Sequence, residues 1–380
     1  MHTVGDLVDH LEGWYPLGTA ESWDRVGLTV GDRADRVERV WCTVDVTPEV
    51  IAEAVAGGAD LIVAHHPLLL RGVHTVTSDT AKGRMVSELI RNRVALWSGH
   101  TNADCAADGV AEALADALGI RECRPLVPAD GHRMLNLVVF VPTDHVAAVV
   151  DALAGAGAGR VGEYDRCHWA TEGTGSFRPL AGANPYLGER GTVEQVTEAR
   201  VELVLPARSR AAVLAALREA HPYEEPAFHF TDADTGIPVD TGLGRVGVPA
   251  EQITLRALGE RLAEVLPATA GGVRLGDPSA DPDRPVRRIA LLPGAGDSLL
   301  DRVRGLDVDV YITSDLRHHP ASEFLIEGGP ALIDIAHWAA EWLWLPRLAD
   351  KLRGLEQAPE VTVSELNTDP WLLRLGPDVG

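Results

Sequence analysis

Short apolar runs alternate with amphipathic stretches through the first third of the chain. The run at residues 40–46 is followed by Thr47 and Pro48, a pair typical of a helix start because threonine caps free N–H groups and proline fits the first turn. The runs at residues 60–64 and 94–97 are apolar on both faces, which is typical of buried parallel strands. This order of strand, helix and strand predicts an open, largely parallel α/β sheet.

The same order of elements returns near the other end of the chain. Apolar runs at residues 289–293, 308–313 and 331–336 are each followed by a turn or a polar stretch. A His-His-Pro sequence follows a predicted strand in both halves, at residues 65–67 and 318–320. We interpret this as an internal pseudo-repeat, which predicts two similar α/β lobes that face each other.

The middle of the chain, residues 128–242, has a different pattern of predicted elements and its own smaller repeat. Two strand-Pro-helix units, at residues 135–153 and 201–220, are typical of a compact ferredoxin-like α+β domain. We therefore predict an α/β protein with mainly parallel sheets. Its first lobe spans residues 1–127, the ferredoxin-like domain is inserted after it, and a second lobe at residues 243–380 completes the functional site.

Composition and charge narrow the function classes. The 380 residues are 46% hydrophobic and 24% charged, and no stretch reaches the about 18 apolar residues of a membrane helix. The first residues lack a basic start and a long apolar segment, so we expect no signal peptide and a cytoplasmic protein. The formal net charge of -22 disfavours nucleic acid and anionic membranes as partners. The four cysteines show no paired spacing, which disfavours a cysteine-based zinc site.

Metal-ligating side chains follow the predicted strands of both halves. They are His65, His66, His100, Asp104 and His337, and the last of them forms an i, i+4 pair with Glu341. Such a pair alone is more often a surface pair, and a single histidine after a strand is more often a core or turn residue. Ligands bind at the carboxyl ends of strands in α/β sheets. The coincidence of all these residues at strand ends therefore favours a metal site.

Five motifs make the chain similar to the Nif-three-like family, whose members are described as homologues of GTP cyclohydrolase 1 type 2. The motifs are residues 22–28, residues 58–67, residues 100–104, the set Asp334, His337 and Glu341, and residues 367–370. The middle of the chain resembles the insert of the long members, a ferredoxin-like module of the PII or CutA kind. Its landmarks are Gly162, Tyr164, Cys167, Gly173, Gly175, Phe177, Asn184, Pro185, His221, Pro222, Tyr223 and Glu224.

This resemblance implies a dinuclear metal centre in a toroidal homohexamer. The implied ligands are His65, His66, Asp104, His337 and Glu341. Imidazole and carboxylate ligands suit two divalent ions of zinc, manganese, iron, nickel or cobalt.

Other residues are expected to act around these ligands. Asp315 and His319 match residues near the site in the family, and we interpret them as supporting or proton-transfer groups. His100 is expected to orient the Asp104 loop. Asp45, at the end of the first predicted strand, could approach the metals.

The implied activity is hydrolysis of a small molecule, with GTP or another nucleotide as the substrate. The reaction of the family label is hydrolytic opening of the purine ring with release of formate. No phosphate-binding glycine motif is present, so a triphosphate would be held by the metals and by arginines such as Arg71 or Arg317. Hydrolysis of a phosphoester or of another amidine stays open. So does a non-catalytic role, in which a metal-binding regulatory or assembly protein carries a ligand-sensing insert.

Overall fold

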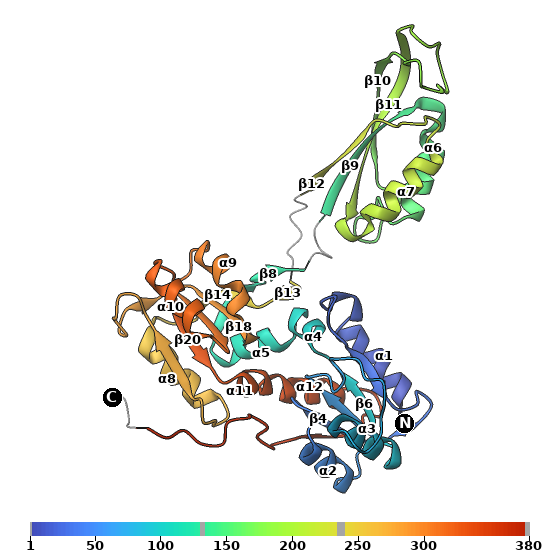
Figure 1. Ribbon diagram of the computed structural model, residues 1–380. Helices are drawn as coiled ribbons and strands as arrows, with labels where there is room; N and C mark the ends of the chain where they lie inside the picture. Colours follow the sequence, from blue (N-terminus) through green and yellow to red (C-terminus); the bar gives the residue numbers. More distant parts are fainter. Residues whose placement is uncertain (1, 130–133, 234–239, 377–380) are drawn as a thin grey trace. The chain divides into compact units, whose positions relative to one another are not determined.

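The computed structural model describes residues 2–129, 134–233 and 240–376. The chain divides into two compact units, one formed by residues 1–128 with 240–380 and the other by residues 129–239 (Figure 1). The predicted insert includes residues 130–133 and 234–239, which lie outside the described residues.

The first sheet of the larger unit has five strands in the order β2-β6-β5-β4-β21. Their bounds are β2 Gly27–Val30, β4 Arg39–Thr43, β5 Leu61–Ala64, β6 Ala95–Ser98 and β21 Glu360–Val363. The pairs among β21, β4, β5 and β6 are parallel, and only the edge strand β2 runs antiparallel. This sheet agrees with the predicted parallel arrangement, and the last strand in the sequence completes its edge.

The second sheet has six strands in the order β16-β20-β19-β18-β14-β7. Their bounds are β7 Ile120–Arg124, β14 Arg245–Pro249, β16 Val273–Gly276, β18 Ile289–Ala295, β19 Val310–Ser314 and β20 Ala331–Ile335. Only the central pairs β18–β19 and β19–β20 are parallel. The expectation of mainly parallel sheets is wrong here, because β14, β7 and β16 all join antiparallel.

Helices cover both faces of the five-stranded and the six-stranded sheet, which explains the apolar runs without alternation. All four residues of β5 are buried, because α1 and α12 pack on one face of its sheet and α2 and α3 on the other. The second sheet lies between α5, α8 and α11 on one face and α9 and α10 on the other. A strand covered on both faces gains stability from every side chain, so its sequence reads as a continuous apolar run.

The helix bounds of the larger unit include four starts that a threonine side chain caps, those of α1, α2, α3 and α8. The bounds are α1 Val4–Trp14, α2 Pro48–Ala56, α3 Ala81–Arg91, α4 Thr101–Cys105, α5 Val110–Ala117, α8 Leu255–Val265, α9 Leu300–Arg304, α10 His318–Ile326, α11 His337–Trp342 and α12 Trp344–Arg353. Thr47 caps α2 by accepting a hydrogen bond from the backbone N–H of Val50, with Pro48 in the first turn. The sequence signal for this helix start is thus confirmed.

Short strand pairs complete the larger unit. They are β1 His2–Thr3 with β3 Arg36–Val37, β8 Val127–Pro128 with β13 Gly242–Leu243, and β15 Ile253–Thr254 with β17 Pro285–Val286. Among the described residues, no helix is both long enough and apolar enough to cross a membrane.

The smaller unit is a four-stranded antiparallel sheet in the order β10-β11-β9-β12. Its elements are β9 Met134–Pro142, α6 Val146–Gly155, β10 Trp169–Phe177, β11 Glu194–Pro206, α7 Arg210–Ala220 and β12 Phe228–Ala233. Both helices lie on the same face of this sheet (Figure 1). Alternate residues of the two central strands, such as Leu137, Val139 and Val201, form the core beneath the helices.

Candidate metal centre

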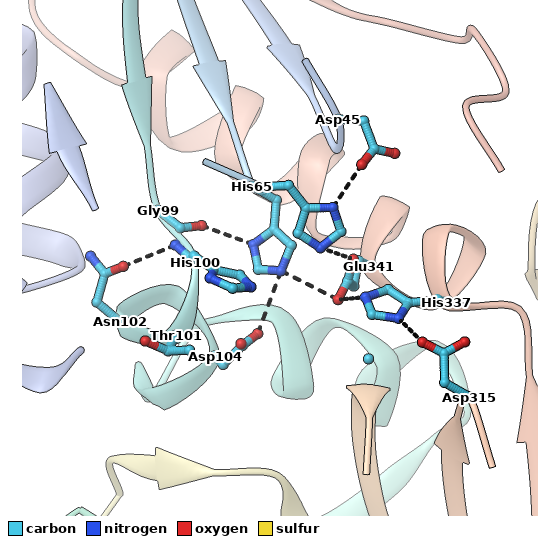
Figure 2. Close-up of polar contacts among 12 residues, drawn as sticks. Asp45, His65, Gly99, His100, Thr101, Asn102, Asp104, Asp315, His337 and Glu341 are labelled. Atoms are coloured by element: carbon cyan, nitrogen blue, oxygen red, sulfur yellow. Dashed lines mark hydrogen bonds and ion pairs between the residues drawn. The ribbon is translucent and has the colours of Figure 1, made fainter. Parts of the chain in front are cut away.

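The carboxyl ends of parallel strands in both sheets of the larger unit deliver polar side chains to one place. His65 and His66 follow β5 directly, and His100 lies between β6 and α4. His337 and Glu341 lie one turn apart on α11, which follows β20. Figure 2 shows the side chains of His65, His337 and Glu341 pointing toward one another.

The carboxylate of Glu341 lies at the centre of this cluster and is almost fully buried. Its Oε1 is 3.4 Å from His65 Nε2 and 2.9 Å from His337 Nε2, and its Oε2 is 3.1 Å from His66 Nε2. The i, i+4 spacing on α11 places His337 and Glu341 side by side. One carboxylate therefore faces three imidazole nitrogens that come from two different sheets.

Each of the three imidazoles is held by a hydrogen bond at its other nitrogen. His65 Nδ1 donates to the carbonyl oxygen of Gly99 at 2.8 Å. His66 Nδ1 is 2.8 Å from a carboxylate oxygen of Asp45, and His337 Nδ1 is 2.7 Å from one of Asp315. Because these acceptors occupy Nδ1, the Nε2 atom of each ring is directed to the Glu341 carboxylate.

His100 follows the same pattern from the opposite side of the cluster. Its Nδ1 is 2.9 Å from Asp24 Oδ1, while Asp24 Oδ2 accepts hydrogen bonds from the backbone and the hydroxyl of Thr101. Burial alone would raise the pKa of Asp24, but its bonds to His100 and Thr101 outweigh it and lower the pKa well below its usual range. His100 is thus fixed by a buried, ionised carboxylate.

The converging atoms fit a metal ion. His65 Nε2 and Asp104 Oδ1 are buried and have no hydrogen-bond partner among the described residues. Buried polar atoms without partners cost free energy unless another group, such as an ion, satisfies them. Two overlapping sets of donor atoms each lie within 4.8 Å of one another. One set is His65, His66 and His100, and the other is His66, His337 and Glu341.

The electrostatics of the cluster also favour a cation. Burial alone would lower the pKa values of His66 and His337, but the charge of Glu341 and hydrogen bonds to carboxylates raise them to about 10 and about 11. Burial and the charge of Glu341 raise the pKa of Asp104 to about 7. The site therefore attracts positive charge, which protons or a divalent ion can supply.

The other residues predicted to act at the site, Asp104, Asp315 and His319, lie at different distances from the cluster. Asp104 lies near the cluster, with Oδ1 3.8 Å from His65 Nε2, but it belongs to neither compact donor set. Asp315 contacts His337 and has a φ of 57°, which turns the chain directly after β19. His319 is exposed on α10, where its ring contacts His318. Within the described part of the chain, no contact joins His319 to the five predicted ligands.

Gly294 forms one wall of the centre. Its φ is +80°, and a Cβ atom at this position would lie 2.9 Å from Glu341 Oε1 and 3.6 Å from His337 Nε2. Any side chain here would push against the central carboxylate, so only glycine leaves the space next to it free.

The comparisons with known proteins agree with the motifs. The family model of Duf34/NIF3, NGG1p interacting factor 3, matches residues 2–370. A Mycobacterium tuberculosis protein named GTP cyclohydrolase 1 type 2 homolog is 48% identical over 372 residues, which cover 97% of each chain. The chain belongs to the Duf34/NIF3 family.

Two solved structures share the fold of this chain. A Bacillus cereus protein related to NIF3 is 33% identical with a TM-score of 0.66, and the match covers 98% of this chain and 99% of that one. Staphylococcus aureus protein SA1388 is 27% identical with a TM-score of 0.72, over 97% and 98% of the two chains. The α/β architecture is therefore that of the Duf34/NIF3 family.

A pocket of about 530 Å³ opens next to the centre in this Duf34/NIF3 protein. His66, His337 and Asp315 form part of its wall, and Lys82 and Arg274 bring positive charge to it. Neither Arg71 nor Arg317, the phosphate-binding candidates chosen from the sequence, lines this pocket. Arg317 is paired with Asp297 instead.

The sequence analysis did not assign a role at the centre to three residues that support it. Gly294 lies in a turn that showed no ligand pattern, and Asp24 is 76 residues from the histidine that it holds. Thr368, from the closing motif, donates a hydrogen bond of 2.6 Å to Asp45. The motifs around Asp24 and Thr368 were visible as a family resemblance, but the contacts they make depend on the folded chain.

Proposed function

We propose that this protein is a metal-dependent hydrolase with two divalent ions bound by His65, His66, Asp104, His337 and Glu341. The convergence of buried donor atoms without hydrogen-bond partners is the observation that carries this proposal. His66 belongs to both donor sets and Glu341 presents both of its oxygens to imidazoles. This arrangement suits two neighbouring ions that share ligands.

The residues around the ligands have the task of holding them in place. Asp45, Asp315 and the carbonyl of Gly99 fix three imidazole rings so that each Nε2 faces the ions. Asp24 fixes His100 in the same way, and we propose His100 as a further ligand or as a group next to the ions. A pair of divalent ions supplies Lewis-acid charge and acidifies water near neutral pH.

We propose that a phosphorylated substrate such as GTP binds in the pocket beside the centre, whose wall carries two cations and also four aspartates, Asp45, Asp315, Asp334 and Asp369. Lys82 is exposed at its wall, and the described part of the chain shows no ion pair for it. Arg274 is paired with Asp334, which also accepts a hydrogen bond from the backbone of Leu316. These two cations would position phosphate groups, while the substrate atom to be hydrolysed lies against the histidine wall. Relatives named GTP cyclohydrolase 1 type 2 homolog favour GTP as the substrate, and hydrolytic opening of its purine ring with formate release is the reaction that the family resemblance implies.

The remaining features extend this proposal. The β-α-β-β-α-β order of the smaller unit supports a ferredoxin-like domain for the insert. We further propose that the chain assembles into a toroidal homohexamer, and that His319 acts in proton transfer only if substrate binding brings it closer to the centre.

The experiment is an assay of formate release from GTP with each metal found in the purified protein. Wild type and Glu341→Ala are compared, with Glu260→Ala as a control because Glu260 is an exposed glutamate on α8. We expect metal-dependent formate release in wild type and in the control, and none in Glu341→Ala, while size-exclusion chromatography shows the same assembly for all three.

Other results would redirect the proposal. Bound metal without formate release would exclude GTP ring opening as the reaction. Phosphoesters and other amidines would then be assayed as substrates. If no substrate is turned over and Glu341→Ala dissociates into subunits, the metal has a structural or regulatory role and the hydrolase proposal is wrong.

A further inference from the structure

The smaller unit contains a cavity of its own, with a volume of about 260 Å³. Its walls come from the ends of β9 and β10, from the segment between β10 and β11, and from the segment between α7 and β12. Gly175, Phe177, Asn184, Pro185, Tyr223 and Glu224 are landmarks of the insert sequence that lie in or next to these walls. The metal centre uses none of them.

This cavity lies on the face of the sheet opposite α6 and α7. On β9, Val139 and Val141 point into the core under α6 and α7, so Phe140 between them points to the other face. On β11, Ala199 is in the core and its neighbour Glu198 lines the cavity. The floor therefore consists of an aromatic ring and a carboxylate.

The sequence provides room for this carboxylate. Glu198 pairs with Gly173 across the β10–β11 ladder and extends over Gly175. A Cβ atom at Gly175 would lie 2.0 Å from Glu198 Oε2, so a side chain at this position would displace the carboxylate. Gly175 thus allows Glu198 to lie flat on the floor of the cavity.

Aromatic rings surround this carboxylate. The ring centroids of Phe177 and Tyr223 are 5.8 Å apart, and those of Tyr186 and Tyr223 are 6.2 Å apart. Tyr186 is 52% exposed, so its ring is open to an incoming ligand. The faces of such rings carry partial negative charge and attract cations within about 6 Å.

The side chains that line the cavity carry a net negative charge. Among the described residues that line it, Glu198, Glu224 and Glu225 are acidic and the exposed Arg178 is the one cation. Burial and the neighbouring Glu198 carboxylate raise the pKa of Tyr223 well above its usual value. An anionic ligand would meet repulsion here, whereas a cation would be attracted by both the carboxylates and the ring faces.

We propose that this cavity binds a small organic cation, an ammonium group with alkyl substituents. Glu198 neutralises its charge from the floor, and Tyr186, Tyr223 and Phe177 contact its alkyl groups. The site belongs to the smaller unit alone and does not depend on the function proposed for the metal centre.

The test is a ligand-observed NMR titration of the intact protein with choline. The matched neutral probe is 3,3-dimethyl-1-butanol, in which a carbon atom replaces the charged nitrogen. We expect choline to bind at least about tenfold more tightly than the alcohol, as cation–π attraction and a nearby carboxylate together predict.

Two variants separate the contributions of charge and aromatic contact. Glu198→Gln keeps the shape of the side chain, and Tyr186→Ala removes a ring that is 52% exposed. Each should weaken choline binding at least about fivefold, while Glu172→Gln, an exposed carboxylate of β10 outside the cavity, should leave it unchanged. Equal binding of the alcohol, no binding of choline, or unchanged affinity in both variants would overturn the proposal.

Discussion

The two sheets of the larger unit carry the same His-His-Pro sequence after a central strand, yet only one copy reaches the metal centre. His65 follows β5 immediately, whereas His318 follows β19 after three intervening residues, 315–317. The position next to β19 belongs to Asp315, which holds His337 from behind. By then the chain has turned, and His318 and His319 begin the exposed start of α10.

This difference shows that the number of residues between a side chain and the strand end determines its role at the site more than the kind of amino acid does. The first residue after a parallel strand lies at the edge where ligands bind, and a few residues later the chain has left that edge. The first sheet therefore supplies imidazoles directly after β5, while the second supplies a supporting carboxylate after β19 and ligands after β20.

We expect the largest loss of metal affinity from a substitution at the point where the ligands of the two sheets meet. Glu341→Ala removes the carboxylate that contacts His65, His66 and His337. Metal affinity should fall by more than the about 100-fold typical of losing a supporting group. Mass spectrometry of bound metal measures the loss, and retention of metal would show that the two sheets bind it independently.

Gly294→Ala should have the next largest effect, because a Cβ atom there would displace the Glu341 carboxylate. We expect about tenfold weaker metal binding and a loss of about 1 kcal/mol in the free energy of unfolding. Gly328→Ala is the matched control, since Gly328 has a φ of +81° and no atom within 4 Å of its Cβ position. It should lose similar stability but keep its metal; equal metal affinity in both variants would contradict the role of Gly294.

The supporting carboxylates test whether the sheets hold their histidines in equivalent ways. Asp45→Asn and Asp315→Asn keep the shape of each side chain but remove the charge that orients His66 or His337. Each should weaken metal binding about tenfold, as measured by competition with a coloured chelator. A tenfold loss in one variant and none in the other would show that the two supports are not equivalent.

The second His-His-Pro copy should show the smallest effect. The double variant of His318→Ala and His319→Ala leaves the cluster untouched, because both residues are exposed on α10. We expect unchanged metal content. A lower content would mean that this copy also reaches the centre, and the contrast between the two sheets would then be wrong.

The sequence predicted much of the architecture where local chemistry determines it. The fully apolar β5 and the Thr47 cap of α2 could be predicted because burial on both faces and capping leave local signals. The antiparallel pairing of β7 with β14 could not, since a strand of this kind carries no sign of which sheet it joins.

The candidate site was partly visible in the sequence for the same reason. His337 and Glu341 are one helical turn apart, so their spacing predicts their proximity. The support of His100 by Asp24, and of Asp45 by Thr368, joins residues far apart in the chain. Such contacts depend on how strands and loops pack, and no local pattern encodes them.

The most direct test of the account is the metal content of the purified wild type and of His65→Ala. His65 Nε2 is fully buried and lies against Glu341 and Asp104, so its loss should disrupt the centre without changing the surface. We predict about two divalent ions per chain in wild type and at most a trace of bound metal in the variant. Equal metal content in the two proteins would contradict the metal centre described above.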